Sequence, residues 1–312
     1  MLINLVPDFL AVTEANDPAA AYDEYLNAYR RLLDPYWRNY VIEPEGPHFH
    51  EIVRATVSAD RRDLREMLAT TDIVKIAAEA EQRCRTWFDV DSDLDVVLMV
   101  GVGAANAGEL VVDGRGVAFI CVEHFTGMQN HSTHGLGLEP ELIALWLAHE
   151  IAHTVRYTSP ASSSEMKALI AESGGNYSFW ETGARATLRE LLINEGVAVQ
   201  AARLVSPGHA EWEYFGYGRR EFSRIRELEP VLTRVAAREL DERGLGLRLR
   251  YLSGGMSDIS RTVDGVLLPE RSGYFLGARM LEGAITEFGL PWALRASAAD
   301  ITRATAALAQ IA

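Results

Sequence analysis

The sequence predicts an α+β fold that is mostly helical and contains one small sheet. Apolar residues recur at three- and four-residue spacing over most of the chain, which is the pattern of amphipathic helices. Two short runs rich in β-branched and apolar residues stand close together between residues 94 and 125 and indicate strands. The chain has 312 residues, 48% of them hydrophobic, which is enough for one large domain or two lobes with a buried core.

Residues 1–90 are expected to form an N-terminal helical region. Helical spacing is clearest over residues 17–89, in AAAYDEYLNAYRRLLDPYW and in SADRRDLREMLATTDIVKIAAEAEQRCRTWF. The pattern changes at LDVVLMVGVG, residues 94–103, and at GVAFICVEHF, residues 116–125, which we interpret as two strands of a small sheet. An Asp-Gly pair at 113–114 has the turn chemistry expected just before the second strand.

Residues 91–312 are expected to form a second region around two prominent helices. The first helix is predicted over about residues 140–157, because Pro140 suits a first helical position and Pro160 follows the apolar stretch. The second is predicted over residues 183–205, up to a Ser-Pro-Gly break.

The segment between these helices, residues 158–182, is expected to be a long Ser- and Gly-rich connection, either a lid or specificity loop or a tolerated insertion. Beyond it, residues 219–312 again show helical patterns and are expected to form a C-terminal helical part. Gly and Pro are expected to interrupt this part near residues 241–247, 253–273 and 289–291.

Charge and composition exclude several classes of protein. A formal net charge of −14 argues against broad binding to nucleic acid or to an anionic membrane, and favours neutral or basic substrates only weakly. The first residues lack the basic and apolar parts of a signal peptide, and no stretch approaches the ~20 apolar residues of a membrane span. Cys84 and Cys121 are too few and too far apart for a disulfide scaffold, so a cytoplasmic location is expected.

The segment HEIAH carries the clearest chemical signal. His149, Glu150 and His153 are the only ionisable residues between Leu142 and Val155. On a helix, the two histidines lie one turn apart on one face, so both imidazoles can reach a single metal ion. Glu150 lies on the adjacent edge, where a carboxylate can act as general base on a metal-bound water. The apolar surroundings favour a buried site over a chance motif on a solvated helix.

A catalytic zinc usually has three protein ligands and an open fourth position, so a third ligand is required. Glu195 lies on the apolar stripe of the helix TLRELLINEGVAVQAARL and is the candidate; a buried ion pair with Arg185 or Arg203 is the alternative. Glu190 lies off the stripe and is expected to be solvated. Gly196 costs stability inside a helix, which suggests that it allows the two helices to approach closely.

HEIAH followed by NEGVA resembles the gluzincin type of zinc metallopeptidase, and more narrowly the bacterial family of predicted zinc-dependent proteases with an HExxH helix and a downstream E-G-x-A helix. The resemblance extends to YDEYLNAYRRLLDPYWRNYV and to GYFLG at residues 273–277. It implies a zincin-like fold with a small sheet beside the HExxH helix. It also implies Zn²⁺ bound by His149, His153 and Glu195, with Glu150 as the base.

Peptide hydrolysis develops negative charge on the carbonyl oxygen, which a Tyr or His donor commonly stabilises in zinc peptidases. Tyr274, within GYFLG, is the candidate donor; it could equally be a core tyrosine with a satisfied hydroxyl, and Tyr157, one turn beyond His153, is the rival. Asn194 is a candidate for orienting a ligand.

We therefore expect zinc-dependent hydrolysis of peptide bonds in a peptide or protein substrate. Two alternatives stay open: a metal-stabilised regulatory or binding protein without turnover, and a nonenzymatic helical interaction module. The sequence leaves open another divalent metal, the preferred side chains, endo- or exopeptidase action and the oligomeric state.

Overall fold

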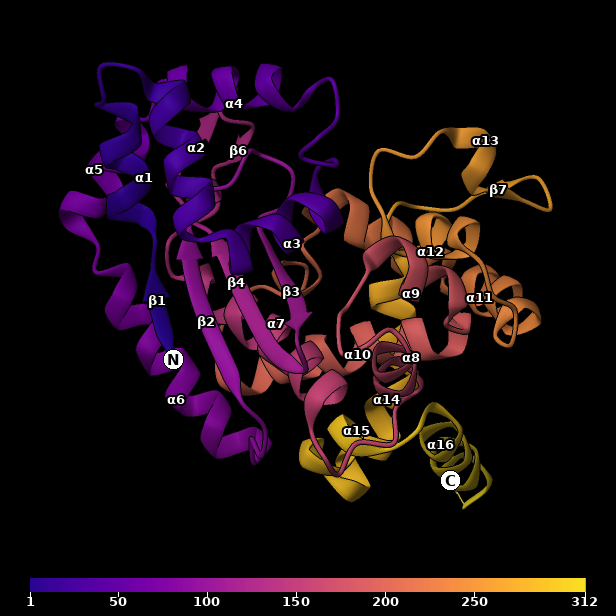
Figure 1. Cartoon of the computed structure of the whole chain (residues 1–312). Helices are drawn as coiled ribbons and strands as arrows, with labels where there is room; N and C mark the ends of the chain where they lie inside the picture. Colours follow the sequence, from indigo (N-terminus) through magenta and orange to yellow (C-terminus); the bar gives the residue numbers. More distant parts are fainter. Residues whose placement is uncertain (312) are drawn as a thin grey trace.

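The computed structural model describes residues 1–311, and the side chains of residues 1–306 (Figure 1). It confirms a mostly helical α+β fold. The N-terminal helices, in indigo and violet, lie on one side of the molecule, and the C-terminal helices, in orange and yellow, lie on the other (Figure 1).

The main sheet has four strands in the order β1-β2-β4-β3. β1 (Leu2–Asn4), β2 (Leu94–Met99) and β4 (Arg115–Cys121) are parallel, and β3 (Ala107–Val112) is antiparallel to β4. β2 begins where the first strand was predicted and β4 begins one residue before the second, and both end earlier than predicted, at residues 99 and 121.

The hairpin between β3 and β4 turns at Asp113 and Gly114, whose φ angles of 53° and 78° are those of the tight turn predicted there. β1 lies inside the predicted N-terminal helical region, before residues 17–89, where the helical spacing was clearest. Its backbone pairs with β2 at Leu2, Ile3 and Asn4, a partnership between residues more than 90 positions apart that local spacing does not indicate.

Six helices follow β1 and agree with the predicted helical region. Asp17 and Asp72 cap two of them, because each carboxylate accepts a hydrogen bond from the backbone three residues on, at 3.1 and 2.9 Å. The helices are α1 (Val6–Thr13), α2 (Pro18–Ala28), α3 (Arg30–Tyr40), α4 (Phe49–Ser58), α5 (Arg62–Thr70) and α6 (Ile73–Phe88).

The HEIAH segment lies in α7 (Leu142–Thr158), the most deeply buried helix of the molecule. Every residue from 142 to 157 is buried, because α7 packs against β3 and β4 on one side and against α6 and α10 on others. α10 (Leu188–Val205) carries NEGVA and also packs against α14 (Ser272–Phe288). The apolar flanks of the motif therefore contact protein on all sides.

The helix predicted over residues 183–205 is in fact two helices. α9 (Phe179–Arg185) ends before Ala186, whose backbone is extended, and α10 begins after Thr187. The Thr187 hydroxyl accepts a hydrogen bond from the backbone N–H of Glu190 at 3.2 Å, so this residue starts a new helix.

The connection predicted over residues 158–182 contains α8 (Glu165–Glu172) and the first turn of α9, and is not a long loop. Ser164 caps α8 by accepting from the Lys167 N–H at 3.2 Å. α8 packs against both α7 and α9, so this segment is part of the packing around the helix that carries HEIAH.

The C-terminal part is helical, with interruptions close to those predicted. The predicted break at 241–247 ends early, because α12 already begins at Leu245, and the break at 253–273 contains a short helix and a hairpin. The elements are α11 (Arg219–Glu239), α12 (Leu245–Leu252), α13 (Asp258–Arg261), β7 (Thr262–Val263), β8 (Val266–Leu267), α14, α15 (Leu290–Arg295) and α16 (Ala298–Ile311).

Four short elements complete the chain: η1 (Val122–His124), β5 (Gln129–Asn130), β6 (Gly135–Leu136) and η2 (Glu213–Phe215). One hydrophobic cluster extends from the N-terminal helices through the sheet to the C-terminal helices. Cys84 and Cys121 lie inside it as buried free thiols. Over the described part of the chain, no helix has the length and apolar character needed to cross a membrane.

Candidate metal centre

The three predicted ligands lie together between α7 and α10. Glu195 Oε2 is 3.3 Å from His149 Nε2 and 3.5 Å from His153 Nε2, and one ligand atom from each residue lies within 4.8 Å of the other two. All three side chains are buried, with at most 7% of each residue exposed. This buried group could hold a metal ion.

Two of the three distances between donor atoms fit a tetrahedral metal site. Ligands at about 2.0–2.1 Å from zinc in a tetrahedral arrangement lie roughly 3.3–3.4 Å from one another. The two distances from the Glu195 carboxylate oxygen match this spacing closely. Two imidazoles and one carboxylate suit zinc and other divalent first-row metals, and leave one coordination position for water or substrate.

The alternative explanation of Glu195, an ion pair with Arg185 or Arg203, is not what the structure contains. Arg185 pairs with Glu172, and Arg203 pairs with Glu211. The only cationic partners that the described residues offer to Glu195 are the two histidines. The carboxylate is therefore held at the centre of the cluster and not at its edge.

The close charges change the pKa values of the cluster. Burial disfavours the charged forms of Glu195 and His153, but their mutual attraction outweighs burial. As a result the pKa of the Glu195 carboxyl falls below its usual range, and the pKa of His153 rises to about 9. Burial lowers the pKa of His149.

Glu150 lies beside the cluster and is only 5% exposed. Burial, followed by the negative charge of Glu109, raises the pKa of the Glu150 carboxyl well above its ordinary value. A carboxylate with a raised pKa takes up a proton more readily than a solvated one, which is the property required of a general base.

These residues line a cavity of about 90 Å³. Tyr274 on α14 also lines it, and its ring stacks on the His149 imidazole with the centroids 5.8 Å apart and an angle of 19° between the planes. Tyr157 stacks on His153, but its hydroxyl donates to Glu109 Oε1 at 3.1 Å and accepts from Asn194 Nδ2 at 2.8 Å. Of the two candidate donors, Tyr274 is therefore the one that lines the cavity.

Asn194 takes part in the site indirectly. It does not approach a ligand but holds the hydroxyl of Tyr157, whose ring in turn supports His153. The ring Nδ1 atoms of His149 and His153 have no hydrogen-bond partner among the described residues. The orientation of the two imidazoles is thus set by the contacts of their Nε2 atoms with Glu195 and by packing against the aromatic rings of Tyr274 and Tyr157.

Gly196 allows a close helix contact, but with α14 and not with α7 as expected. A Cβ atom at Gly196 would lie 2.2 Å from the carbonyl carbon of Gly277, and one at Gly277 would lie 1.8 Å from the Leu192 carbonyl oxygen. Both distances are shorter than any real carbon contact. The glycine of NEGVA and the second glycine of GYFLG therefore bring α10 and α14 together, and with them Glu195 and Tyr274.

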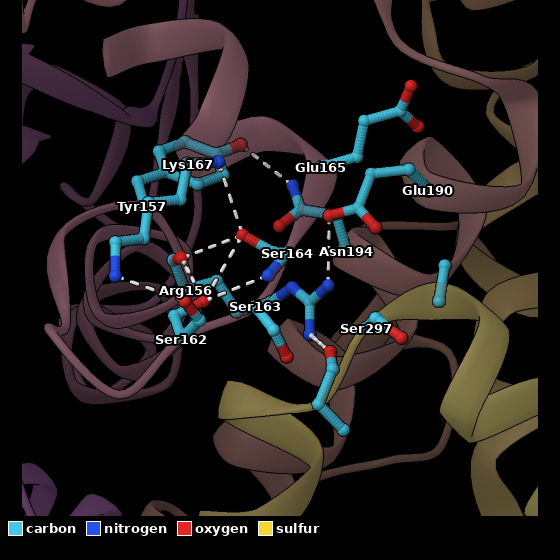
Figure 2. Close-up of polar contacts among 12 residues, drawn as sticks. Arg156, Tyr157, Ser162, Ser163, Ser164, Glu165, Lys167, Glu190, Asn194 and Ser297 are labelled. Atoms are coloured by element: carbon cyan, nitrogen blue, oxygen red, sulfur yellow. Dashed lines mark hydrogen bonds and ion pairs between the residues drawn. The ribbon is translucent and has the colours of Figure 1, made fainter.

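Glu190 is fully buried, and the expectation that it is solvated was wrong. Arg156 Nη2 donates to Glu190 Oε1 at 2.9 Å, and neither residue is exposed at all (Figure 2). Arg156 Nη1 also donates to the backbone oxygens of Ala293 and Ala296, at 2.8 and 3.2 Å. The pair therefore ties α7 and α10 to α15.

The backbone of Arg156 is also fixed. Figure 2 shows Ser162 and Ser164 directed at its carbonyl oxygen, to which their hydroxyls donate at 2.7 and 2.9 Å. These serines belong to the segment that was expected to be a loop. They instead secure the C-terminal end of the helix that carries His149 and His153.

Several residues that line the cavity were not predicted from the sequence. Glu109 comes from β3, Arg248 from α12, Phe179 from α9 and Tyr40 from α3. None of them stands near HEIAH or NEGVA in the chain. A charged residue in an apolar run, as in AGELVV, was the only signal available for Glu109.

The comparisons with known proteins add no further information on these residues. No family model, curated protein or solved structure matches this chain. The chemistry of the site must therefore be argued from its own geometry, which brings two imidazoles, three carboxylates and two tyrosines around one small cavity.

Proposed function

We propose that the chain is a zinc-dependent hydrolase that cleaves peptide bonds, with a zincin-like fold of the gluzincin type. The observation that supports this most is the close approach of the helices that carry HEIAH and NEGVA. One ligand atom each from His149, His153 and Glu195 lies within 4.8 Å of the other two, and Glu150 lines the same cavity. Peptides or proteins are the proposed substrates.

A zinc ion held by these ligands would polarise the scissile carbonyl and lower the pKa of water towards roughly 7. Glu150 would accept the proton of the attacking water and deliver it to the leaving nitrogen. The Tyr274 hydroxyl would donate a hydrogen bond to the carbonyl oxygen as negative charge develops there. The buried surroundings strengthen each of these interactions, because the local dielectric is low.

The test combines metal content with one variant. Protein purified without added metal should contain one equivalent of zinc per chain and should hydrolyse members of a broad peptide library. Glu150→Gln keeps the size of the side chain and removes the base, so zinc should stay while turnover falls by about 100-fold or more. Absence of zinc uptake, or unchanged turnover in the variant, would overturn the proposal.

A metal-stabilised binding protein without turnover is the second candidate, and one observation favours it. The cavity of about 90 Å³ is much smaller than a typical ligand pocket of roughly 300–1,000 Å³. A cavity of this volume cannot enclose a peptide. Zinc binding combined with no hydrolysis of any library peptide would select this candidate.

A further inference from the structure

Arg248 is an unusual residue of the cavity wall. Four arginines are at least nine-tenths buried among the side chains that the structure describes: Arg61, Arg156, Arg248 and Arg261. Arg156 and Arg261 form ion pairs with carboxylates. Arg61 and Arg248 do not, and of these two only Arg248 lines the cavity that contains the candidate metal ligands.

The guanidinium of Arg248 is held in place without a negative partner. Nη2 donates to the Tyr177 hydroxyl at 2.9 Å, and the group lies over the ring of Phe179, 3.8 Å from the centroid. Nε has no hydrogen-bond partner among the described residues. Gly183 leaves room for the side chain, since a Cβ there would lie 2.7 Å from Nη1.

The nearest acidic residue of the wall is already engaged. Glu109 Oε2 accepts from the Tyr40 hydroxyl at 2.9 Å, and Glu109 Oε1 accepts from Tyr157 at 3.1 Å. It forms no ion pair with Arg248. Burying a guanidinium without a paired anion is unfavourable, and here the position is fixed by an aromatic ring and a hydroxyl before any ligand arrives.

We propose that Arg248 binds a carboxylate of the peptide substrate, either the C-terminal carboxylate or an acidic side chain. The inference rests on the proposed function and narrows its substrate class. A guanidinium has five N–H donors in a planar fork that matches a carboxylate, and Arg248 uses one of them on Tyr177. Contact between Arg248 and a carboxylate is screened far less than the net charge of −14, which is spread over the whole chain, but Glu109, Glu150 and Glu195 line the same cavity and oppose a bound anion.

The test measures binding as well as turnover. Three N-acetylated peptides are titrated calorimetrically into zinc-loaded protein carrying Glu150→Gln: trialanine with a free C-terminal carboxylate, its amide, and an amide ending in aspartate. One or both carboxylate peptides should bind about 10- to 100-fold more tightly than the trialanine amide, as a charge-assisted hydrogen bond implies. The peptide that binds more tightly than the trialanine amide shows whether Arg248 binds a C-terminal carboxylate or an acidic side chain.

Variants then assign the effect to Arg248. Arg248→Met should abolish the preference, and Arg248→Lys, which keeps the charge but loses the planar fork, should reduce it severalfold. Arg234→Met is the matched control, because Arg234 is exposed on α11 and its loss changes the net charge equally. It should leave the preference intact.

Equal binding of the three peptides, or an unchanged preference in Arg248→Lys and Arg248→Met, overturns the inference. If Arg248→Met does not fold, the binding of the three peptides to the parent protein and to Arg248→Lys still shows whether the preference depends on Arg248. Hydrolysis of acid and amide peptides at equal rates by the parent chain would overturn the role of Arg248 and leave the hydrolase intact. Carboxylate binding that depends on Arg248, without zinc or hydrolysis, would support the role of Arg248 and overturn the proposed hydrolase.

Discussion

Replacing Glu190 with alanine is expected to destabilise the fold strongly while leaving zinc stoichiometry unchanged. The variant leaves the Arg156 guanidinium fully buried, with two backbone carbonyls as its remaining acceptors. Removing one partner of a buried pair typically costs about 3–5 kcal/mol, because the other charge is left without compensation. The carboxylate of Glu190 points roughly 140° away from that of Glu195 around the α10 axis, so the ligand set is retained.

Urea unfolding of metal-free protein measures this loss. The midpoint should fall without a large change in the slope, which depends on the surface exposed by unfolding. Glu79→Ala is the control, since Glu79 is exposed and faces Lys75 at 3.9 Å on α6; its loss should cost no more than about 0.5 kcal/mol. Zinc per folded chain is measured on both variants.

The double variant Arg156→Met with Glu190→Leu separates pairing from packing. Apolar residues of similar size remove both charges together, so much of the lost stability should return. Recovery is incomplete, because the backbone oxygens of Ala293 and Ala296 lose their donor. A loss below about 1 kcal/mol in Glu190→Ala would contradict the reasoning, since it would mean that Arg156 finds another anion or water.

Three further predictions concern the site. Glu195→Ala removes the central ligand, so zinc affinity in a chelator competition should fall by at least tenfold; unchanged affinity would exclude this residue as a ligand. Tyr274→Phe should lower kcat more than it raises KM, whereas Tyr157→Phe should mainly lower the unfolding midpoint, because its hydroxyl joins two buried groups. Gly196→Ala should lower the melting temperature measured by calorimetry, since its methyl group meets the backbone of Gly277, and a stable variant would show that α10 and α14 can separate.

The parts of the site that could be predicted are those in which local spacing fixes geometry. His149 and His153 share a face because a helix repeats every 3.6 residues, and an apolar stripe identifies Glu195 as a residue of the buried side of α10. The same helix geometry correctly separates Glu190 from the ligands. It does not show what the face of α10 that carries Glu190 contacts. In the structure Arg156 pairs with Glu190 and also donates to the backbone of α15.

The elements that were not predicted depend on contacts that the spacing of apolar residues does not show. β1 exists because residues 2–4 pair with β2, and α8 is stabilised by its packing on α7 and α9. The end of α9 and the start of α10 are set by a single capping threonine, Thr187, within a continuous helical pattern. β1 is decided by pairing with a strand more than 90 positions away. α8 instead packs on the helices next to it in the chain, and Thr187 acts through a hydrogen bond to a residue three positions on, so these two features depend on local contacts that apolar spacing does not show.

The cavity that contains the candidate ligands is also lined by Glu109 and Arg248, whose contacts with residues remote in sequence determine its charges. Glu109 and Arg248 come from a strand and a helix nearly 140 positions apart, and each is immobilised by its own aromatic partners and not by the other. If the two were paired, the wall would be neutral and closed to charged ligands. Because Glu109 is bound by two tyrosine hydroxyls, its negative charge stays next to Glu150 and supports the raised pKa of that carboxyl. Arg248 Nε has no hydrogen-bond partner among the described residues, so the same cavity is lined by the proposed general base, Glu150, and by the proposed carboxylate-binding group, Arg248.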